Sequence, residues 1–451
     1  MKRAILNLFP PFLREHAEGV DVSSVGYRFA RGAFWSVTGA VISRGMALIS
    51  SFVVARYIGK YGFGELGIIQ STAGMFQVFA GFGLALTGTK HVAELRAKDP
   101  QKAGRIIALS NLVAAGTGVL FAAVLFILAP WIAAKILAAE RLTGLLRVSS
   151  LLLFFGALNG AQTGALSGFE AFKTIARVNM FAGVSSFPLM VGGVYLAGLE
   201  GVVWGLVASM VVNFFLNHTA LRKESRRFGV PLTYAGCVRE WPVLLSFSVP
   251  AVLSSAMVMP VYWACSAMLV NQPDGYSEMG IYNAANQWFA ALLFIPVMVG
   301  QVVLPMLSER IGMKDEIRST KILSFSIKFN ALLVSPLILL ACLASPWIMN
   351  CYGEEFRSGW ITLVVVLLTA GLLAVQTPVG HIIAASGKMW VAFLMNSGWA
   401  LSFIVFTILL VKRGALGLAA ARLFAYCLHA IWTFAWVYSF TRGKIVFHDV
   451  G

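Results

Sequence analysis

Residues 32–55, with the sequence GAFWSVTGAVISRGMALISSFVVA, decide the fold of this chain. The run is long enough to cross the bilayer core of about 30 Å as one helix, yet Arg44 stands at its middle. On a helix the small and weakly polar residues, Ser43 among them, share one face, and Arg44 lies at the edge of that face. A guanidinium at mid-membrane costs at least about 3 kcal/mol. We therefore expect Arg44 to face protein or a water-filled cavity.

Two interpretations of Arg44 stay open at this point. In the first it is a structural arginine that donates hydrogen bonds to carbonyls of a neighbouring helix. In the second it is a cation that binds an anionic solute, and Ser43 on the adjoining face lines the same cavity.

The composition excludes a soluble enzyme. The chain has 451 residues, of which 59% are hydrophobic and 12% are charged, and no soluble domain of this size buries so much apolar surface. We predict an all-α polytopic membrane protein with about twelve transmembrane helices. The apolar runs lie at 32–55, 66–88, 105–132, 148–167, 175–197, 200–220, 243–270, 279–305, 322–345, 359–385, 390–411 and 415–440.

The positive charge of the chain predicts its orientation. Of the 35 Lys and Arg residues, 25 fall on the side of the expected membrane that holds both termini and 8 fall on the other side. Cytoplasmic loops carry such an excess, so both termini are expected to be cytoplasmic. The net charge of +16 then reflects topology and contact with anionic membrane lipids, which disfavours a nucleic-acid partner.

The basic segment at 221–242 divides the expected helices into six and six. We predict an N-terminal cytoplasmic or interfacial arm at 1–31 and an N-lobe at 32–220. The linker at 221–242 precedes a C-lobe at 243–440, and a cytoplasmic tail follows at 441–451. Two lobes of this kind form a transporter with a central site.

An internal repeat supports this division. Gly62–Gly67 reads GFGELG after the first expected helix, and Gly275–Gly280 reads GYSEMG after the seventh, 213 residues later. Because each half has an even number of spans, the repeats keep the same orientation. We expect the two segments to be turns on the same, extracytoplasmic side, related by a pseudo-twofold axis along the membrane normal.

Prolines predict a hinge in the run 243–270. Pro250 and Pro260 each remove a backbone hydrogen bond from a helix interior, so this helix should bend at them. We expect it to move during transport.

The polar residues of the expected spans favour an anionic substrate. No span has a carboxylate near its middle, whereas Arg44, Arg422 and His381 lie within spans. A guanidinium pairs two phosphate oxygens at once, which points to phosphate or pyrophosphate. Arg422 is also close enough to the end of its helix to reach the interface by snorkelling, and His381 also fits a polar contact between helices. No catalytic, cofactor or metal-ligand pattern is present.

Three amides near the start of the eighth expected helix, Asn283, Asn286 and Gln287, form a polar cluster. They either bind sugar hydroxyls or hydrogen-bond the seventh helix. A membrane glycosyltransferase or polymerase is the rival functional class, but the outer loops of about a dozen residues leave no room for a catalytic domain. The sequence therefore predicts transport and not catalysis.

Several stretches resemble a known family: FARGAFWSVTGAVISRGMALISSFVVARYIGKYGFGELGIIQST (29–72), FAGFGLALTGTKHVAEL (79–95), GALSGFEAFK (164–173) and FSVPAVLSSAMVMPVYWACSAMLVNQPDGYSEMGIYNAANQW (247–288). They are similar to the Wzx-type oligosaccharide flippases, of the superfamily that also holds the MATE drug exporters and the lipid II flippases. The resemblance implies two six-helix lobes in a V and a cationic central cavity. Arg44 falls where relatives carry a cavity arginine, and Arg422 matches no such position.

The function that this resemblance implies is transfer of undecaprenyl-pyrophosphate-linked oligosaccharide from the inner to the outer leaflet of the bacterial inner membrane. The pathway is O-antigen or exopolysaccharide assembly. Expected partners are the lipid-linked oligosaccharide, membrane lipids and the polysaccharide polymerase machinery, with a monomer as the working unit. The alternative is a MATE-like, ion-coupled exporter of small molecules. A lipid II flippase is disfavoured by the count of twelve helices.

Overall fold

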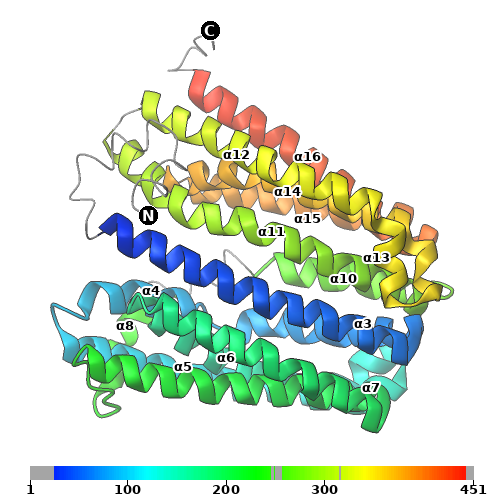
Figure 1. Ribbon diagram of the computed structural model, residues 1–451, viewed down its shortest axis with the longest axis horizontal. Coiled ribbons are helices and arrows are strands. Elements are labelled where there is room, and N and C mark those ends of the chain that lie inside the picture. Colours follow the sequence, from blue (N-terminus) through cyan, green and yellow to red (C-terminus); the bar gives the residue numbers. More distant parts are fainter. Residues whose placement is uncertain (1–24, 245–247, 249–255, 314–315, 387, 443–451) are drawn as a thin grey trace.

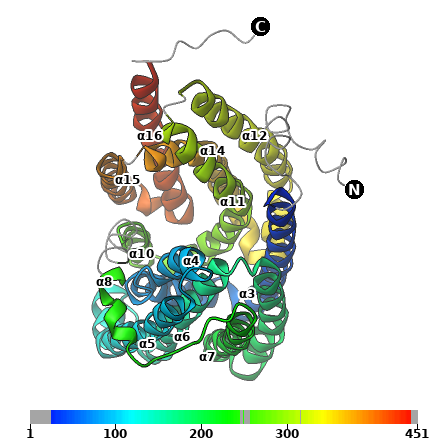
Figure 2. The same cartoon turned by 90° about the vertical axis from the view of Figure 1, so that its left-hand side faces the viewer.

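The computed structural model describes residues 25–244, 248, 256–313, 316–386 and 388–442. Within these residues the chain is helical and no strand occurs. Figures 1 and 2 show two groups of helices, one above the other, with α3 and α11 side by side between them. We refer to α3–α7 as the N-terminal bundle and to α10–α16 as the C-terminal bundle.

The N-terminal bundle contains the first six expected spans. Its long helices are α3 (Val25–Ala80), α4 (Leu84–Leu95), α5 (Pro100–Trp131), α6 (Thr143–Gly168) and α7 (Phe172–Arg227). Two of these helices each hold two spans, because the backbone leaves the helical region at Gly59 in α3 and at Ala197 and Gly198 in α7. Short helical turns, η1 (Ile132–Ile136) and η2 (Glu140–Leu142), connect α5 to α6.

The C-terminal bundle contains the other six. After η3 (Cys237–Glu240) and α8 (Trp241–Val243) come α10 (Val258–Val270), α11 (Gly275–Gly312), α12 (Glu316–Leu343), α13 (Ser345–Tyr352), α14 (Trp360–Ala385), α15 (Met389–Leu410) and α16 (Gly414–Arg442). Seven described stretches are long and apolar enough to span a membrane, and three of them, 41–80, 172–227 and 390–439, each cover two expected spans. The prediction of a polytopic all-α fold is confirmed.

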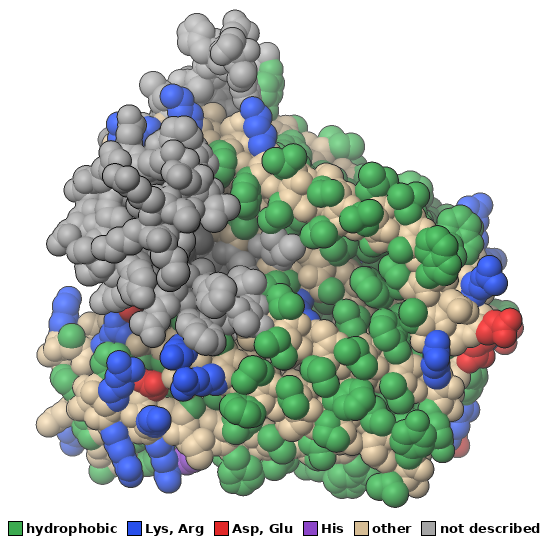
Figure 3. Space-filling view, viewed as in Figure 1, with side chains coloured by type: hydrophobic (Ala, Val, Ile, Leu, Met, Phe, Trp, Pro, Cys, Tyr) green, Lys and Arg blue, Asp and Glu red, His purple; other side chains and the backbone are tan. Residues whose placement is uncertain are grey.

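The surface agrees with a membrane-spanning protein. Figure 3 shows apolar side chains over the middle of the visible face, and Lys and Arg side chains gathered at the end where α4 meets α5. Hydrophobic side chains such as Leu196, Ile127 and Leu332 are 73–89% exposed. Such exposure of large apolar groups is expected where lipid is the solvent. The protein is therefore a multi-pass membrane protein.

The prolines predicted as hinges do not both act on a helix interior. Pro250 lies outside the described residues. Pro260 is the third residue of α10, in the first turn, where a helix has no backbone acceptor for the amide that proline lacks. Pro260 therefore does not interrupt the interior of α10, and its role as a hinge stays a prediction.

The two repeated segments are helical, so the expectation of turns is also wrong. Gly62–Gly67 lies in α3 just after the Gly59 kink, and Gly275–Gly280 forms the first turns of α11. The two segments pack directly on each other. A Cβ on Gly64 would overlap the carbonyl oxygen of Tyr276, and a Cβ on Gly280 would overlap that of Lys60. The repeats thus meet at the same end of the molecule, as predicted.

A second pair of glycines supports the repeat. Gly198, between the two halves of α7, has φ 56° and ψ −132°. Gly414, at the start of α16, has φ 65° and ψ −144°. This backbone conformation is open to glycine and strained for other residues. Its recurrence 216 residues later shows that the fifth and sixth spans join as the eleventh and twelfth do.

The basic segment between the bundles packs on the N-terminal bundle. Residues up to Arg227 continue α7, and beyond them Val230 and Cys237 are each 2% exposed. Glu240 accepts a hydrogen bond of 2.9 Å from Nε of Arg105 in α5. The segment predicted as a linker is thus held against α5, and its assignment as the boundary between two lobes stays a prediction.

Replacing Glu240 by alanine should release this segment. Partly exposed ion pairs of this kind contribute about 1 kcal/mol or less, and cleavage of a locally opened segment follows the population of the open form. We expect tryptic cleavage at Arg239 to become about fivefold faster, as followed by mass spectrometry of the intact chain. Glu200→Ala, on an exposed position of α7, is the control, and an unchanged cleavage rate for Glu240→Ala would show that the ion pair does not hold the segment.

Candidate functional site

The small-residue face of α3 packs against α7. A Cβ on Gly183 of α7 would lie 2.7 Å from Cα of Ser43, and a Cβ on Gly39 would lie 2.7 Å from the carbonyl oxygen of Ala176. Ser43 therefore faces a helix and not the cavity described below. The small residues allow α3 and α7 to approach closely, and this packing leaves the neighbouring face of α3 free.

Arg44 lies on that free face and lines a cavity of about 460 Å³ between the two bundles. The walls come from α3, α7 and α11 and are mostly apolar. Ser51, Gln70 and Gln287 are the polar lining residues besides Arg44. The structure thus brings together Arg44 and Gln287 of the predicted site.

Arg44 reaches across to α11. Its Nη1 donates a hydrogen bond to the carbonyl oxygen of Ala290, and its guanidinium lies 4.8 Å from the centre of the Phe294 ring. A cation at this distance is attracted by the ring. Arg44 therefore combines features of both interpretations, since it bonds a carbonyl of a neighbouring helix and also lines a cavity.

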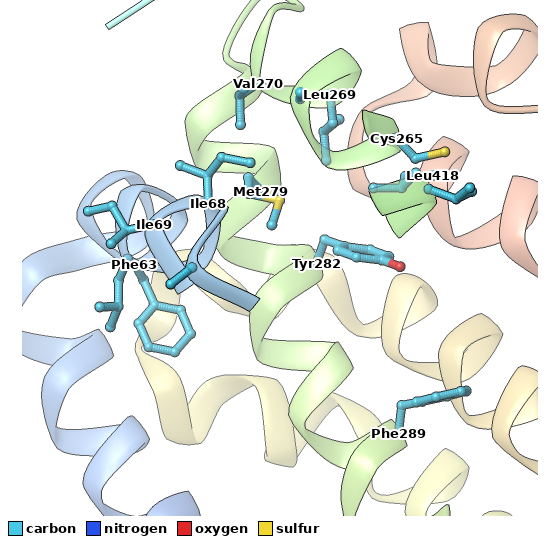
Figure 4. Close-up of a cluster of buried hydrophobic side chains, with 14 of the residues drawn as sticks. Phe63, Ile68, Ile69, Cys265, Leu269, Val270, Met279, Tyr282, Phe289 and Leu418 are labelled. Carbon is cyan, nitrogen blue, oxygen red and sulfur yellow. The ribbon is translucent and has the colours of Figure 1, made fainter. Parts of the chain in front are cut away.

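Arg422 lies elsewhere, inside the C-terminal bundle, and is 3% exposed. Its guanidinium packs 3.6 Å from the ring centre of Phe289 and 4.7 Å from that of Tyr262. Nη1 donates to Oδ1 of Asn286 at 2.7 Å and to the hydroxyl of Tyr282 at 3.4 Å. In Figure 4 the side chains of Tyr282 and Phe289 leave α11 on the same side. Snorkelling to the interface is excluded, and the structure does not bring Arg422 or Asn286 to the cavity.

Neutral groups surround the charge of Arg422. Among the residues that the structure describes, no carboxylate lies within ion-pair distance of it. Burial of an unpaired charge costs several kcal/mol, which the two aromatic faces and the amide and phenol oxygens offset in part. In this conformation Arg422 therefore contacts only side chains of its own bundle among the partners that the structure describes, and its role in substrate binding stays a prediction.

The last two predicted residues also make helix contacts. Nδ2 of Asn283 donates to the carbonyl oxygen of Phe63 at 3.3 Å, so it joins α11 to α3. His381 of α14 packs on α11, where a Cβ on Gly300 would overlap its ring. Neither residue lines the cavity.

Sequence reasoning missed four groups at this site. Ser51 and Gln70 are polar residues in apolar runs, so their polarity was the available signal. Phe294 was indistinguishable from the many other aromatic residues of the spans. The carbonyl of Ala290 belongs to the backbone, so no sequence pattern identifies it. In the described part of the chain, no three His, Cys, Asp or Glu side chains come together as metal ligands.

Contacts close the molecule at the end where α3 bends. Nε of Arg56 donates to the carbonyl oxygen of Cys351 at 2.8 Å, and the amide of Lys60 donates to Glu355 at 2.7 Å. Each of these bonds joins the N-terminal bundle to the C-terminal bundle. The two bundles are therefore in direct contact at this end of the molecule.

Comparison with known proteins places these features in a family. A relative from Ralstonia solanacearum, "EPS I polysaccharide export inner membrane protein EpsE", is 24% identical over 397 residues, which cover 86% of this chain and 88% of the relative. The Escherichia coli (strain K12) "Lipid III flippase" is 24% identical over 299 residues, 63% of this chain and 68% of that protein.

The fold is that of solved transporters. An inward-facing multidrug resistance MATE family transporter of the MOP superfamily superposes with a TM-score of 0.75 at 12% identity, covering 91% of this chain and 100% of that one. The sequence profile of the family described as "Polysaccharide biosynthesis protein" matches residues 29–310, which are more than half of the chain and include Arg44 and its partners on α11, Ala290 and Phe294. The chain belongs to this polysaccharide biosynthesis protein family.

Proposed function

We propose that the protein is a flippase that moves undecaprenyl-pyrophosphate-linked oligosaccharide across the bacterial inner membrane by alternating access, for O-antigen or exopolysaccharide assembly. The observation that carries the proposal is the position of Arg44. A fixed cation lines an otherwise mostly apolar cavity between two helix bundles. The relatives named as a polysaccharide export protein and a lipid III flippase support the same substrate class.

Arg44 and Gln287 are the proposed substrate contacts among the residues predicted from sequence. The guanidinium pairs with phosphate oxygens of the carrier, and the Gln287 amide hydrogen-bonds oxygen atoms beside it. Ser51 and Gln70 join them on the cavity wall. Ser43, Asn283, Asn286, His381 and Arg422 position the helices that carry these groups, and Pro250 and Pro260 remain candidates for the bend that accompanies transport.

We also propose that the basic end of the molecule seen in Figure 3 faces the cytoplasm. Arg and Lys are retained on the cytoplasmic side during insertion. The first described residue of α3 and the last of α16 lie at this end in Figure 1, in agreement with cytoplasmic termini. We infer a functional monomer that passes its product to polysaccharide polymerase machinery.

A MATE-like exporter of small molecules is the second candidate, because the fold is shared with such transporters. Ion-coupled export generally uses a carboxylate inside the membrane. None of the residues lining the described cavity is acidic. The charge of the cavity therefore favours the anionic substrate.

The proposal is tested in a bacterial strain that lacks its own copy of the gene, with surface polysaccharide and membrane protein level measured together. Expression of the chain should restore full-length polysaccharide, and purified protein in proteoliposomes should expose a fluorescent lipid-linked oligosaccharide to the outer leaflet. Ethidium efflux is measured in the same vesicles. Efflux of ethidium without lipid translocation would overturn the flippase proposal in favour of the exporter.

A further inference from the structure

Helix α11 lies between two arginines. Arg44 of α3 contacts it from the N-terminal bundle, and Arg422 of α16 contacts it from inside the C-terminal bundle. Each guanidinium packs on a phenyl ring of α11, at 4.8 Å from Phe294 and 3.6 Å from Phe289 respectively. Each also donates a hydrogen bond to an oxygen of α11. The two contacts are chemically alike and differ in what surrounds them.

The Arg422 contact is sealed, whereas the Arg44 contact is open to the cavity. Arg422 is 3% exposed, and no solute reaches it without unpacking the bundle. Arg44 lines the cavity together with Ala290, and both residues are exposed. An anion that enters the cavity therefore meets the guanidinium at the place where it joins α3 to α11.

We propose that the contact of Arg44 with Ala290 and Phe294 is a latch between the two bundles, which the diphosphate of the substrate releases. The inference rests on the proposed function, because it takes a diphosphate as the ligand of Arg44. It adds that substrate binding itself breaks a contact between the bundles.

The acceptors that compete for Arg44 differ in strength. The carbonyl of Ala290 is neutral, and as a carbonyl inside a helix it has its own amide partner four residues later. It therefore loses little when Arg44 leaves. A diphosphate oxygen is charged, so it adds a Coulombic attraction to the guanidinium that the neutral carbonyl lacks, and two phosphate oxygens accept two parallel hydrogen bonds from the planar fork. The guanidinium consequently exchanges the carbonyl and the ring for the diphosphate, and α11 is freed from α3.

Competition of this kind has a reciprocal consequence. If diphosphate binding weakens the latch, then weakening the latch must strengthen diphosphate binding by the same factor. Loss of the Phe294 ring should therefore raise the affinity of the cavity for a diphosphate. A residue that merely shapes the cavity or supports the fold would lower affinity when truncated, so the direction of the change separates the two roles.

The test uses the full chain in lipid nanodiscs, with inorganic pyrophosphate as the probe and calorimetry as the measurement. Phe294→Leu should bind pyrophosphate about three- to tenfold more tightly than the wild type, a factor that equals about 0.7 to 1.4 kcal/mol and matches a partly exposed cation–ring contact. Phe289→Leu is the matched control. It removes the equivalent ring under Arg422, and we expect its pyrophosphate affinity to stay within about twofold of the wild type.

The outcomes distinguish failure of Arg44 as the diphosphate ligand from failure of the latch alone. Arg44→Ala should abolish pyrophosphate binding, and wild-type binding by this variant would overturn Arg44 as the diphosphate ligand and the latch with it. If binding depends on Arg44 but Phe294→Leu binds no more tightly, only the latch is wrong. Phe294→Met, which keeps the volume of the side chain, repeats the test if the leucine variant elutes as aggregate. Farnesyl diphosphate serves as a second probe. If the diphosphate alone competes for Arg44, Phe294→Leu should raise the affinity for both probes by the same factor.

Discussion

Surface polysaccharide is expected to disappear when Arg44 is replaced by alanine, although the protein still inserts into the membrane. Two charge-assisted hydrogen bonds to a diphosphate are lost, and we expect transport to fall by at least about 100-fold, since such bonds are worth about 1.5–3 kcal/mol each. Arg44→Lys should keep partial transport, because lysine retains the charge but not the planar fork. Arg44→Glu should abolish transport through repulsion.

The measurement pairs the polysaccharide length distribution with the amount of membrane protein in the same cells. Removal of a charge from mid-membrane eases insertion, so the protein level should not fall. If Arg44 were only structural, the Arg44→Ala variant would give less folded protein in the membrane but normal transport per molecule. Full-length polysaccharide at wild-type levels in cells that carry Arg44→Ala would contradict a role of Arg44 in substrate binding.

The second large effect is expected at the contact between the repeated segments. A leucine at Gly64 or Gly280 would drive its Cβ into a backbone carbonyl of the opposite bundle. Backbone atoms cannot rotate away as side chains do, so the two segments must separate. The end of the molecule near Gly59 then cannot close, and alternating access loses one of its two states. We expect each substitution to abolish transport while the protein remains in the membrane.

Gly74→Leu provides the control on the same helix, because a Cβ at Gly74 meets no atom within 4 Å. It should transport at close to the wild-type rate. Normal transport by Gly64→Leu and Gly280→Leu would show that tight contact between the two segments is not needed at any stage of the cycle.

Length and hydropathy were sufficient to predict the spans. Most of the expected runs correspond to helices or half-helices, because a bilayer fixes the length of an apolar helix. The run 66–88 is divided between α3 and α4, and residues 245–247 and 249–255 of the run 243–270 lie outside the described residues. The physical cost of a charge at mid-membrane predicted that Arg44 faces protein or a cavity, and Arg44 both contacts α11 and lines the cavity. The repeated segments Gly62–Gly67 and Gly275–Gly280 were correctly expected at one end of the molecule. Their glycines allow close packing between helices, and glycines in a turn would give the same sequence pattern.

The side on which a polar residue lies within its bundle was not predictable. Ser43 faces α7 because small residues suit both a cavity wall and tight helix packing. Arg422 was expected to face the cavity or the interface, yet it is enclosed by Tyr262 and Phe289. Bundle interior and lipid are both apolar, so the residues around a span do not distinguish them in sequence. The aromatic cage forms only when α10, α11 and α16 come together.

The sealed guanidinium of Arg422 makes the C-terminal bundle an electrically charged moving part. No described carboxylate lies within ion-pair distance of it, so any displacement of this guanidinium along the membrane normal carries a positive charge through the transmembrane field. A full crossing is worth about 2.3 kcal/mol per 100 mV, and a fraction of that distance gives the same fraction of the energy. The resting potential of a cell, negative inside, therefore favours the conformation that holds Arg422 nearer the cytoplasm, and the translocation rate in proteoliposomes should depend on an imposed diffusion potential.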